Sequence, residues 1–345
     1  MAMRRPAGGH AQLKTVNARP QHLVFTSMNH RLVLSGLLIF LVAFAGQAAE
    51  MSSFKTSYTY KTVSGCPIQA DVYRPNDRLI RPVILWIHGG ALIFGRRDNI
   101  KTRQLERYLE AGFAVVSIDY RLAPETKLVD ILQDVRDAYD WIRAKGPEGF
   151  YINPDRIAVV GHSAGGYLTL TSGYRLQPPP RALVSFYGYG DITGSWYSQP
   201  DPFYLKEPAV SKEKAFEVVG RKAVSEPSDE DHRWHFYLYC RQQGLWPKEV
   251  AGHDPASEPR AFDPFCPARN VTKDYPPTLL LHGDKDTDVP FEQSEQMAGE
   301  LKRHGVEYEF IRIPEGPHGF DSRFDDPQVA HAFDRVIDFL TAHLK

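Results

Sequence analysis

The chain has 345 residues, of which 41 are basic and 42 acidic, and its formal net charge is −1. Residues 1–48 contain five of the basic residues and no acidic ones, so the rest of the chain carries 36 basic and 42 acidic side chains. Such a mildly acidic surface disfavours binding to nucleic acid or to anionic membranes. The length suits one large α/β domain, because such domains exceed the usual length per domain.

The first 48 residues have the pattern of an export signal. An apolar run at 32–45 follows a basic residue, and small residues follow it, as in a secretory signal peptide. Met28 would start a compact signal peptide, so we interpret residues 1–27 as the result of a start site assigned too early. We expect cleavage after Ala48 and a secreted or periplasmic protein. The run is too short to favour a stable membrane span, and an uncleaved anchor is the alternative.

From residue 52 onward, strand-like and helix-like segments alternate. Short apolar runs are typical of buried parallel strands, and apolar residues spaced three and four apart are typical of helices. We expect strands at 57–63, 68–73, 82–87, 113–118, 156–160, 181–187, 277–281 and 308–313, the first two as an antiparallel pair. We expect helices at 100–111, 129–145, 164–174, 292–304 and 328–344, the second ending at Gly146-Pro147. The alternation predicts an α/β fold with a mainly parallel central sheet and helices on both faces.

Residues from about 190 to 275 interrupt this rhythm with many prolines and aromatic residues. Two helices are expected within them, at 211–224 and 230–243. An insertion of this size usually has a function. We interpret it as a cap over the carboxyl edge of the sheet, and the alternative is a packing accessory away from the site.

The chain has three cysteines, Cys66, Cys240 and Cys266. An odd number leaves at least one thiol unpaired within the chain, although export would permit a disulfide. Cys240–Cys266 is the candidate bridge because both residues lie in the insertion. The spacing of cysteines and histidines does not suggest a metal site, so we expect neither a metal nor an organic cofactor.

A G-x-S-x-G motif at 161–165 places Ser163 between a predicted strand and a predicted helix. A tight turn at this point pushes the serine hydroxyl into the cleft, and only small neighbours tolerate the crowded backbone. The amide of Ala164, at the start of the helix, would face a developing oxyanion. This context predicts a nucleophilic serine.

The sequence His88-Gly89-Gly90-Ala91 follows another predicted strand. Consecutive glycines let backbone amides approach a ligand closely, so the amides of Gly89 and Gly90 are the other expected oxyanion donors. We interpret His88 as a structural residue that holds this loop. The alternative for the motif is an ordinary glycine turn.

The acid and the base of a serine nucleophile should follow later strands, in the order Ser, Asp, His. Three aspartates, Asp284, Asp286 and Asp288, follow the strand at 277–281, and their positions alone do not choose among them. Aspartates in such a loop are often turn or capping residues. His318 lies on a glycine-flanked loop after the strand at 308–313, from which its ring could reach Ser163 and accept its proton.

Taken together, the motifs resemble the α/β-hydrolase esterases and lipases, in particular the hormone-sensitive-lipase-like and bacterial feruloyl-esterase-like groups. The matching segments are HGGA at 88–91, DYRLAPE at 119–125, GHSAGG at 161–166, HGDKDTDVP at 282–290 and HGF at 318–320. The resemblance implies an α/β-hydrolase fold and makes Asp286 the acid of a Ser163–Asp286–His318 triad. It also implies that Asp119-Tyr120-Arg121 braces the oxyanion loop.

The chain departs from the hormone-sensitive-lipase-like pattern at several points. His162 stands where those esterases usually have an acidic residue, Ala91 replaces the last glycine of HGGG, and the large insertion replaces an N-terminal helical cap. These departures favour the feruloyl-esterase-like or prolyl-oligopeptidase-like side of the superfamily.

The sequence therefore predicts a serine carboxylester hydrolase for small or medium acyl or aryl esters, with a small-molecule ester as its partner. The first alternative is a serine peptidase resembling the prolyl oligopeptidase catalytic domain. Against it, the chain lacks the length of a propeller domain, and Ala164 stands where those peptidases usually have tyrosine. A catalytically inactive binding protein is the second alternative. The sequence leaves the oligomeric state open.

Overall fold

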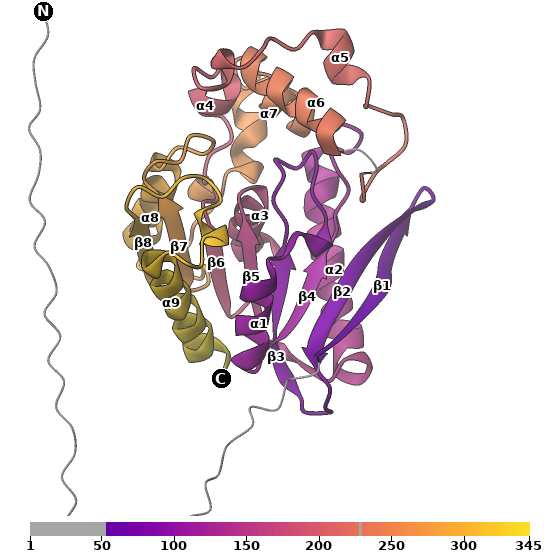
Figure 1. Cartoon of the computed structure of the whole chain (residues 1–345), viewed down its shortest axis with the longest axis vertical. Helices are drawn as coiled ribbons and strands as arrows, with labels where there is room; N and C mark the ends of the chain where they lie inside the picture. The colour runs from indigo at the N-terminus through magenta and orange to yellow at the C-terminus, as the bar shows by residue number, and fades with distance from the viewer. Residues whose placement is uncertain (1–52, 228–229) are drawn as a thin grey trace, which may run out of the picture. The chain divides into compact units, whose positions relative to one another are not determined.

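The computed structural model describes residues 53–227 and 230–345, so the predicted signal segment lies outside it. An eight-stranded sheet with the strand order β1-β2-β4-β3-β5-β6-β7-β8 runs through the described part (Figure 1). β1 and β2 are antiparallel, β2 is antiparallel to β4, and the other neighbours are parallel. The strands are β1 Ser53–Val63, β2 Cys66–Pro75, β3 Arg81–Ile87, β4 Ala114–Ile118, β5 Ile152–His162, β6 Ala182–Phe186, β7 Thr278–Gly283 and β8 Tyr308–Ile313.

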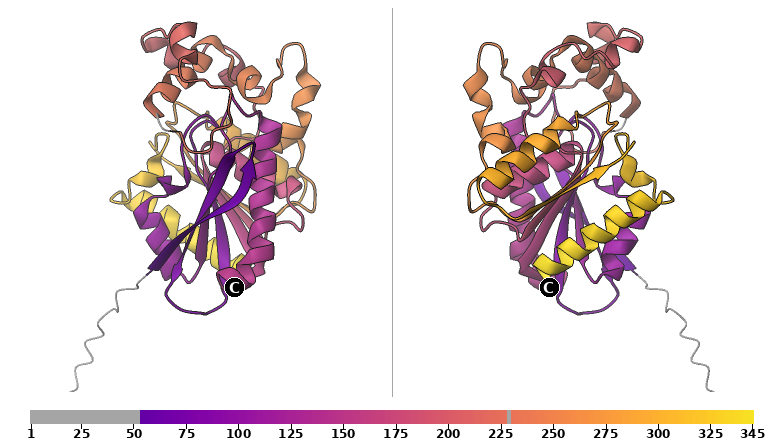
Figure 2. Two further views of the ribbon diagram at one scale, coloured as in Figure 1. Left: turned by 90° about the vertical axis from the view of Figure 1, so that its right-hand side faces the viewer. Right: turned by 90° about the vertical axis from the view of Figure 1, so that its left-hand side faces the viewer.

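Helices cover both faces of this sheet (Figure 2). Along β3, Val83, Leu85 and Ile87 belong to one buried core, whereas Ile84 and Trp86 belong to the other. Because successive side chains of a strand point to opposite faces, an almost wholly apolar strand supplies both cores. Helices α2 Leu128–Gly149, α3 Ala164–Arg175 and α8 Glu292–Arg303 complete the first core, and α1 Thr102–Glu110 and α9 Pro327–Leu344 complete the second.

The predicted α/β fold with a mainly parallel central sheet is confirmed, and every predicted strand of the sheet is present. One helix end was predicted wrongly. α2 continues through Pro147 to Gly149, although we expected it to stop at Gly146-Pro147. Proline keeps a helical φ, and the Phe150 amide still donates to the Gly146 carbonyl oxygen at 2.9 Å, so the last turn survives.

A second correction concerns the segment between β6 and β7. The helix predicted at 211–224 is only α5 Lys212–Phe216, whereas the helix predicted at 230–243 is confirmed as α6 Glu230–Gln243. Two valines and Gly220 follow α5 and weaken its helix propensity. Beyond it, the Val224 carbonyl oxygen accepts a hydrogen bond from the Leu122 amide, so the backbone is bound to the α/β domain instead.

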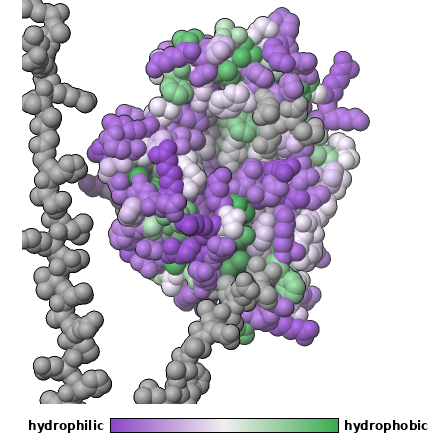
Figure 3. Space-filling view, in the orientation of Figure 1, coloured by the Kyte–Doolittle hydropathy of each residue, from purple (hydrophilic) through white to green (hydrophobic). Residues whose placement is uncertain are grey.

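The segment predicted as a cap, residues 190–275, has helices as its only regular elements among the described residues, and it lies beyond the carboxyl ends of the parallel strands (Figure 1). We refer to it as the cap segment. Three of its large apolar side chains, Phe203, Leu205 and Trp234, are exposed. Apolar residues also gather over these elements at the top of Figure 3, on a face that is otherwise mostly hydrophilic. Its further elements are α4 Ser195–Ser198, η2 Tyr204–Lys206, α7 Trp246–Ala251, η3 Pro259–Phe265 and η4 Pro267–Arg269.

All three cysteines are free thiols, and Cys240 and Cys266 are buried. The candidate Cys240–Cys266 bridge is therefore absent from the structure. Cys240 lies in α6, whereas the Cys266 sulfur contacts Asp191, near the start of the cap segment. Shared membership of one insertion did not bring the two thiols together. Among residues 53–227 and 230–345, no helix is both long and apolar enough to span a membrane.

Candidate active site

Ser163 occupies a strained turn between β5 and α3, with φ 55° and ψ −119°. Such a φ is uncommon for a residue with a side chain. A Cβ on Gly161 would lie 2.2 Å from the Gly165 carbonyl oxygen, and a Cβ on Gly165 would lie 2.1 Å from the Ile87 carbonyl oxygen. Only glycine fits at either position, so the crowding expected from the motif is present.

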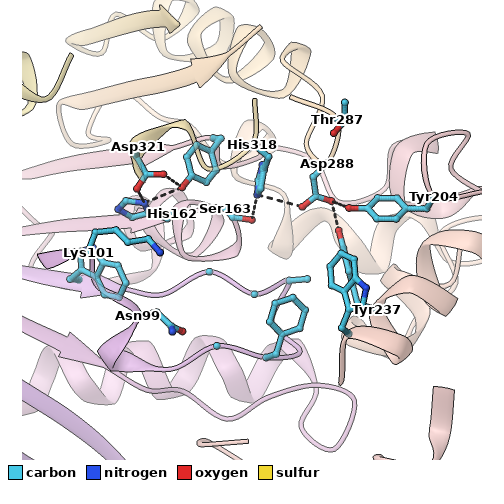
Figure 4. Close-up of a pocket in the computed structure, with 18 residues that line it drawn as sticks. Asn99, Lys101, His162, Ser163, Tyr204, Tyr237, Thr287, Asp288, His318 and Asp321 are labelled. Atoms are coloured by element: carbon cyan, nitrogen blue, oxygen red, sulfur yellow. Dashed lines mark hydrogen bonds and ion pairs between the residues drawn. The ribbon is translucent and has the colours of Figure 1, made fainter. Parts of the chain in front are cut away.

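His318 follows β8 and turns its ring towards Ser163. Its Nε2 lies 3.1 Å from the Ser163 Oγ (Figure 4), and its Nδ1 lies 2.7 Å from Asp286 Oδ2. The structure thus brings together Ser163, His318 and Asp286, three of the predicted site residues. They come from the loops after β5, β8 and β7, which all end at the same edge of the sheet.

Asp286 is held in place from both sides of its carboxylate. Its Oδ1 accepts hydrogen bonds from the amides of Asp288 and Val289, at 2.8 and 2.9 Å. Burial alone would raise the pKa of Asp286, but hydrogen bonds from His282 and His318 outweigh burial and keep this pKa well below its usual value. The carboxylate is therefore ionised wherever the protein is folded at ordinary pH.

The neighbouring Asp284 faces away from His318. Its carboxylate pairs with Arg312 at 2.6 Å and accepts from the Glu315 amide at 2.7 Å, which suits the turn role considered for it. For Asp288 the turn or capping interpretation is wrong, because its side chain points into the pocket beside Ser163.

Charge at His318 depends on three carboxylates. Burial alone would lower the pKa of His318, but Asp288, Asp286 and Asp321 together raise it above its ordinary value. Asp288 Oδ2 lies 3.4 Å from Nε2, the ring nitrogen that faces Ser163. A positive charge on this imidazole is therefore stabilised from two sides.

The glycine turn after β3 packs directly against the serine turn. A Cβ on Gly89 would lie 2.9 Å from the His162 carbonyl oxygen and 3.3 Å from the Ser163 Cβ. Gly90 has φ +100°, and a Cβ there would lie 2.1 Å from the Phe94 carbonyl oxygen. Gly89 is therefore required by the close approach of the two turns, and Gly90 by its positive φ and its contact with Phe94 in the same loop.

Tyr120 holds the glycine turn in place. Its hydroxyl donates to the carbonyl oxygens of His88 and Gly89, at 3.0 and 3.3 Å, and its ring stacks on the His88 ring. Burial lowers the pKa of His88 to about 4, so this ring is neutral near pH 7. The bracing implied by the resemblance thus belongs to Tyr120, while Asp119 pairs with Arg97 and Arg121 with Asp134.

His162, the residue before the nucleophile position, makes a contact that the sequence did not reveal. Its Nδ1 lies 2.9 Å from Asp321 Oδ2, and Tyr187 donates to the other carboxylate oxygen. Burial would raise the pKa of Asp321, but His162 and Tyr187 outweigh it and lower this pKa to about 2. Asp321 lies three residues after His318, so it joins the loop of His318 to the serine turn.

A cavity of about 520 Å³ opens beside Ser163. In Figure 4, Asn99 and Lys101 lie on one side of Ser163, whereas Asp288 lies on the other. Aromatic side chains from both the α/β domain and the cap segment line part of the cavity wall: Trp86, Phe94, Tyr187, Tyr204, Trp234 and Tyr237.

The cap segment reaches the site through a buried arginine. Arg241 of α6 pairs with Asp288 Oδ1 at 2.6 Å and with Asp201 at 2.5 Å. Tyr204 and Tyr237 donate to the same oxygen of Asp288. Sequence alone gave no sign of this cluster, because it joins positions 40 to 84 residues apart.

Residues 84–322 match the family described as having the α/β-hydrolase fold. They make up well over half of the chain, and we conclude that the chain belongs to this family.

Curated relatives match only a small part of their own length. The chain is 29% identical over 311 residues to a non-reducing polyketide synthase of Preussia isomera, and the match covers 80% of the chain but 14% of the synthase.

Solved structures share the fold. A Staphylococcus aureus protein of unknown function has a TM-score of 0.69 at 23% identity, covering 84% of this chain and 100% of its own. A thermophilic esterase from Thermogutta terrifontis has a TM-score of 0.59 at 20% identity, covering 84% of this chain and 92% of its own.

Proposed function

We propose that this chain is a serine carboxylester hydrolase for small-molecule esters with small or medium acyl or aryl groups. The observation that carries the proposal is the continuous row of polar contacts from Ser163 through His318 to Asp286, with 3.1 and 2.7 Å between partners. Ser163 lies on a turn whose glycines, Gly161 and Gly165, have no room for a side chain. A hydroxyl, an imidazole and a carboxylate in this arrangement form an activated nucleophile.

In the proposed reaction, His318 Nε2 accepts the Ser163 proton as Oγ attacks the ester carbonyl carbon. Asp286 holds the ring in the tautomer that leaves Nε2 free and stabilises the imidazolium that forms. His318 then gives the proton to the leaving alcohol oxygen, and the acyl group stays on Ser163. Water then attacks the carbonyl carbon of the acyl-enzyme while His318 accepts its proton. His318 returns that proton to Ser163 Oγ, and the carboxylic acid is released.

The oxyanion would be held by the amides of Gly89, Gly90 and Ala164. The close approach of the glycine turn to the serine turn supports this assignment, since a Cβ on Gly89 would lie 3.3 Å from the Ser163 Cβ. Ala164 is the first residue of α3, where backbone N–H groups lack helical acceptors. In comparable enzymes one such donor contributes about 3–4 kcal/mol to transition-state stabilisation.

Ester specificity is supported by the aromatic side chains in the cavity wall, which suit apolar acyl or aryl groups. The structural neighbour from Thermogutta terrifontis is itself an esterase. A peptide substrate is the alternative.

A substrate panel tests the proposal. p-Nitrophenyl esters of increasing acyl length should turn over faster than aminoacyl p-nitroanilides, and a fluorophosphonate should label wild type but not Ser163→Ala. Ser172→Ala is a matched control, because Ser172 lies on α3 but bonds only the Leu168 carbonyl oxygen. Faster anilide turnover would reassign the chain as a peptidase, and labelling of Ser163→Ala would remove Ser163 from the chemistry.

We also propose that residues 1–48 direct export and are removed after Ala48. The apolar run at 32–45 and the small residues after it support this. N-terminal sequencing of the mature protein from an exporting host should start at Ala49, and retention of residues 28–48 would contradict it.

A further inference from the structure

The two oxygens of Asp288 have different surroundings. Oδ1 accepts from the hydroxyls of Tyr204 and Tyr237 and from Arg241. No described residue donates a hydrogen bond to Oδ2, whose one polar neighbour is His318 Nε2 at 3.4 Å. The side chain is 21% exposed, and it lines the cavity beside Ser163. One carboxylate oxygen is thus fixed in position and the other is an unused acceptor.

The unused oxygen lies on the side of the leaving alcohol. This step rests on the proposed function, in which His318 Nε2 must come within hydrogen-bonding distance of the alcohol oxygen to protonate it. Asp288 Oδ2 is 3.4 Å from the same nitrogen, so this carboxylate oxygen faces the group attached next to the alcohol oxygen of the ester. The acyl group, held on Ser163, does not occupy this position.

We propose that Asp288 selects esters whose alcohol part carries a free hydroxyl on the carbon next to the ester-bearing carbon, that is, monoesters of vicinal diols such as polyols or sugars. When two oxygens on adjacent carbons are gauche, the distance between them is close to the donor–acceptor distance of a hydrogen bond. When the ester oxygen contacts His318 Nε2, the neighbouring hydroxyl can therefore donate to Asp288 Oδ2. Tyr237 and Trp234 line the cavity here, and their rings offer faces for the C–H groups of such an alcohol.

A hydroxyl fits this position better than a cation does. Asp288 is already paired with Arg241 at 2.6 Å, which neutralises much of its charge. The reaction also places a positive charge on His318, next to Oδ2, and a substrate cation there would be repelled in the transition state. A neutral donor has no such conflict, and burial raises the pKa of Tyr237 so that it stays a donor to Oδ1.

The first test needs only the wild-type protein and three butyrate esters, 2-hydroxyethyl, 2-methoxyethyl and n-propyl. The methoxy compound keeps the electron withdrawal of the hydroxyl but cannot donate, and the propyl compound keeps the size. A hydrogen bond to a charged acceptor predicts that kcat/KM for the hydroxyethyl ester exceeds both others by roughly 10- to 100-fold. Equal values for the three esters would overturn the proposal. Faster turnover of the choline ester than of the hydroxyethyl ester would overturn it in favour of a cation.

The second test uses Asp288→Asn. The three donors around Oδ1 would force the amide oxygen into that position, so the NH2 group would replace Oδ2 and turn an acceptor into a donor. The hydroxyethyl-to-methoxyethyl ratio of kcat/KM should then fall to about one or below. Asp201→Asn is the matched control, because it removes the other carboxylate partner of Arg241 outside the cavity lining, and it should keep the wild-type ratio. An unchanged ratio in Asp288→Asn, or an equal loss in Asp201→Asn, would overturn the proposal.

Failure of this proposal can be told apart from failure of the proposed function. Hydrolysis of all three esters through Ser163 with no preference would leave the esterase intact and remove only the role of Asp288. No hydrolysis of any ester, together with no fluorophosphonate labelling, would remove the proposed function itself.

Discussion

At the scale of single residues, the loop after β7 separates three aspartates that look alike in sequence. Asp286 accepts from His318, Asp284 pairs with Arg312, and Asp288 binds α6. Their backbones are neighbours, but the direction of each side chain gives it a different partner. A substitution at Asp284 can therefore serve as a control for the same substitution at Asp286.

Asp286→Asn should lower kcat by about 10⁴-fold, because an amide cannot hold the His318 tautomer that leaves Nε2 free. Asp284→Asn should change kcat little, since the Asp284 carboxylate binds Arg312 and the Glu315 amide and not the His318 ring. Steady-state kinetics on one p-nitrophenyl ester measures both variants. Similar losses in the two variants would show that the loop fold, and not the Asp286 carboxylate, controls the rate.

The pH dependence follows from the carboxylates around His318. Activity needs the neutral imidazole, so kcat/KM falls on the acid side as His318 gains a proton, and a raised pKa puts that fall at higher pH. Asp288→Asn removes one of the charges that raise this pKa, and the acid limb should move to lower pH. Asp284→Asn should leave the limb in place. A limb that stays or moves to higher pH in Asp288→Asn would contradict the assignment.

At the scale of elements, two helical glycines have opposite roles. Gly165 in α3 lies against β3, where a Cβ would collide with the Ile87 carbonyl oxygen. Gly299 in α8 has no atom within 4 Å of a Cβ position. Gly165 is therefore required by packing, whereas Gly299 only lowers the helix propensity of α8.

Gly299→Ala should therefore raise the free energy of unfolding by about 0.5–1 kcal/mol, through better helix propensity. Gly165→Ala should lower that free energy and abolish activity, because the serine turn must shift. Urea unfolding followed by circular dichroism measures both. Stabilisation by Gly165→Ala with full activity would mean that the turn is not crowded as described.

At the scale of the whole α/β domain and its cap segment, two buried arginines of α6 link the two: Arg233 pairs with Glu125 at 2.8 Å, and Arg241 pairs with Asp288 at 2.6 Å. Arg241 also pairs with Asp201, and its guanidinium lies 4.5 Å from the Tyr204 ring centroid. Arg241→Met would leave two carboxylates with no cation, which should cost about 3–5 kcal/mol of folding free energy. Arg241→Lys keeps the charge but cannot span both partners, so its loss in urea unfolding should be smaller. Equal, small losses would mean that contacts other than those of Arg241, such as the Arg233–Glu125 pair, hold the cap segment in place.

The sequence predicted the sheet, most helix positions and the close approach of Ser163 and His318, because these follow from local patterns within short segments. The choice of Asp286 needed the resemblance to known esterases, since the three aspartates share one loop. The pair of His162 and Asp321 and the cluster around Arg241 could not be predicted. No motif in the sequence marks these residues as partners, and only the folded arrangement of the loops brings them into contact.

The central claim is that an acyl group passes through Ser163. The most direct measurement is intact-mass and peptide mass spectrometry of enzyme quenched in acid within the first turnover of a p-nitrophenyl ester. The account predicts one acyl group per chain, located on the peptide that contains Ser163, and none in Ser163→Ala. An acyl group on another residue, or ester turnover at the wild-type rate by Ser163→Ala, would contradict it.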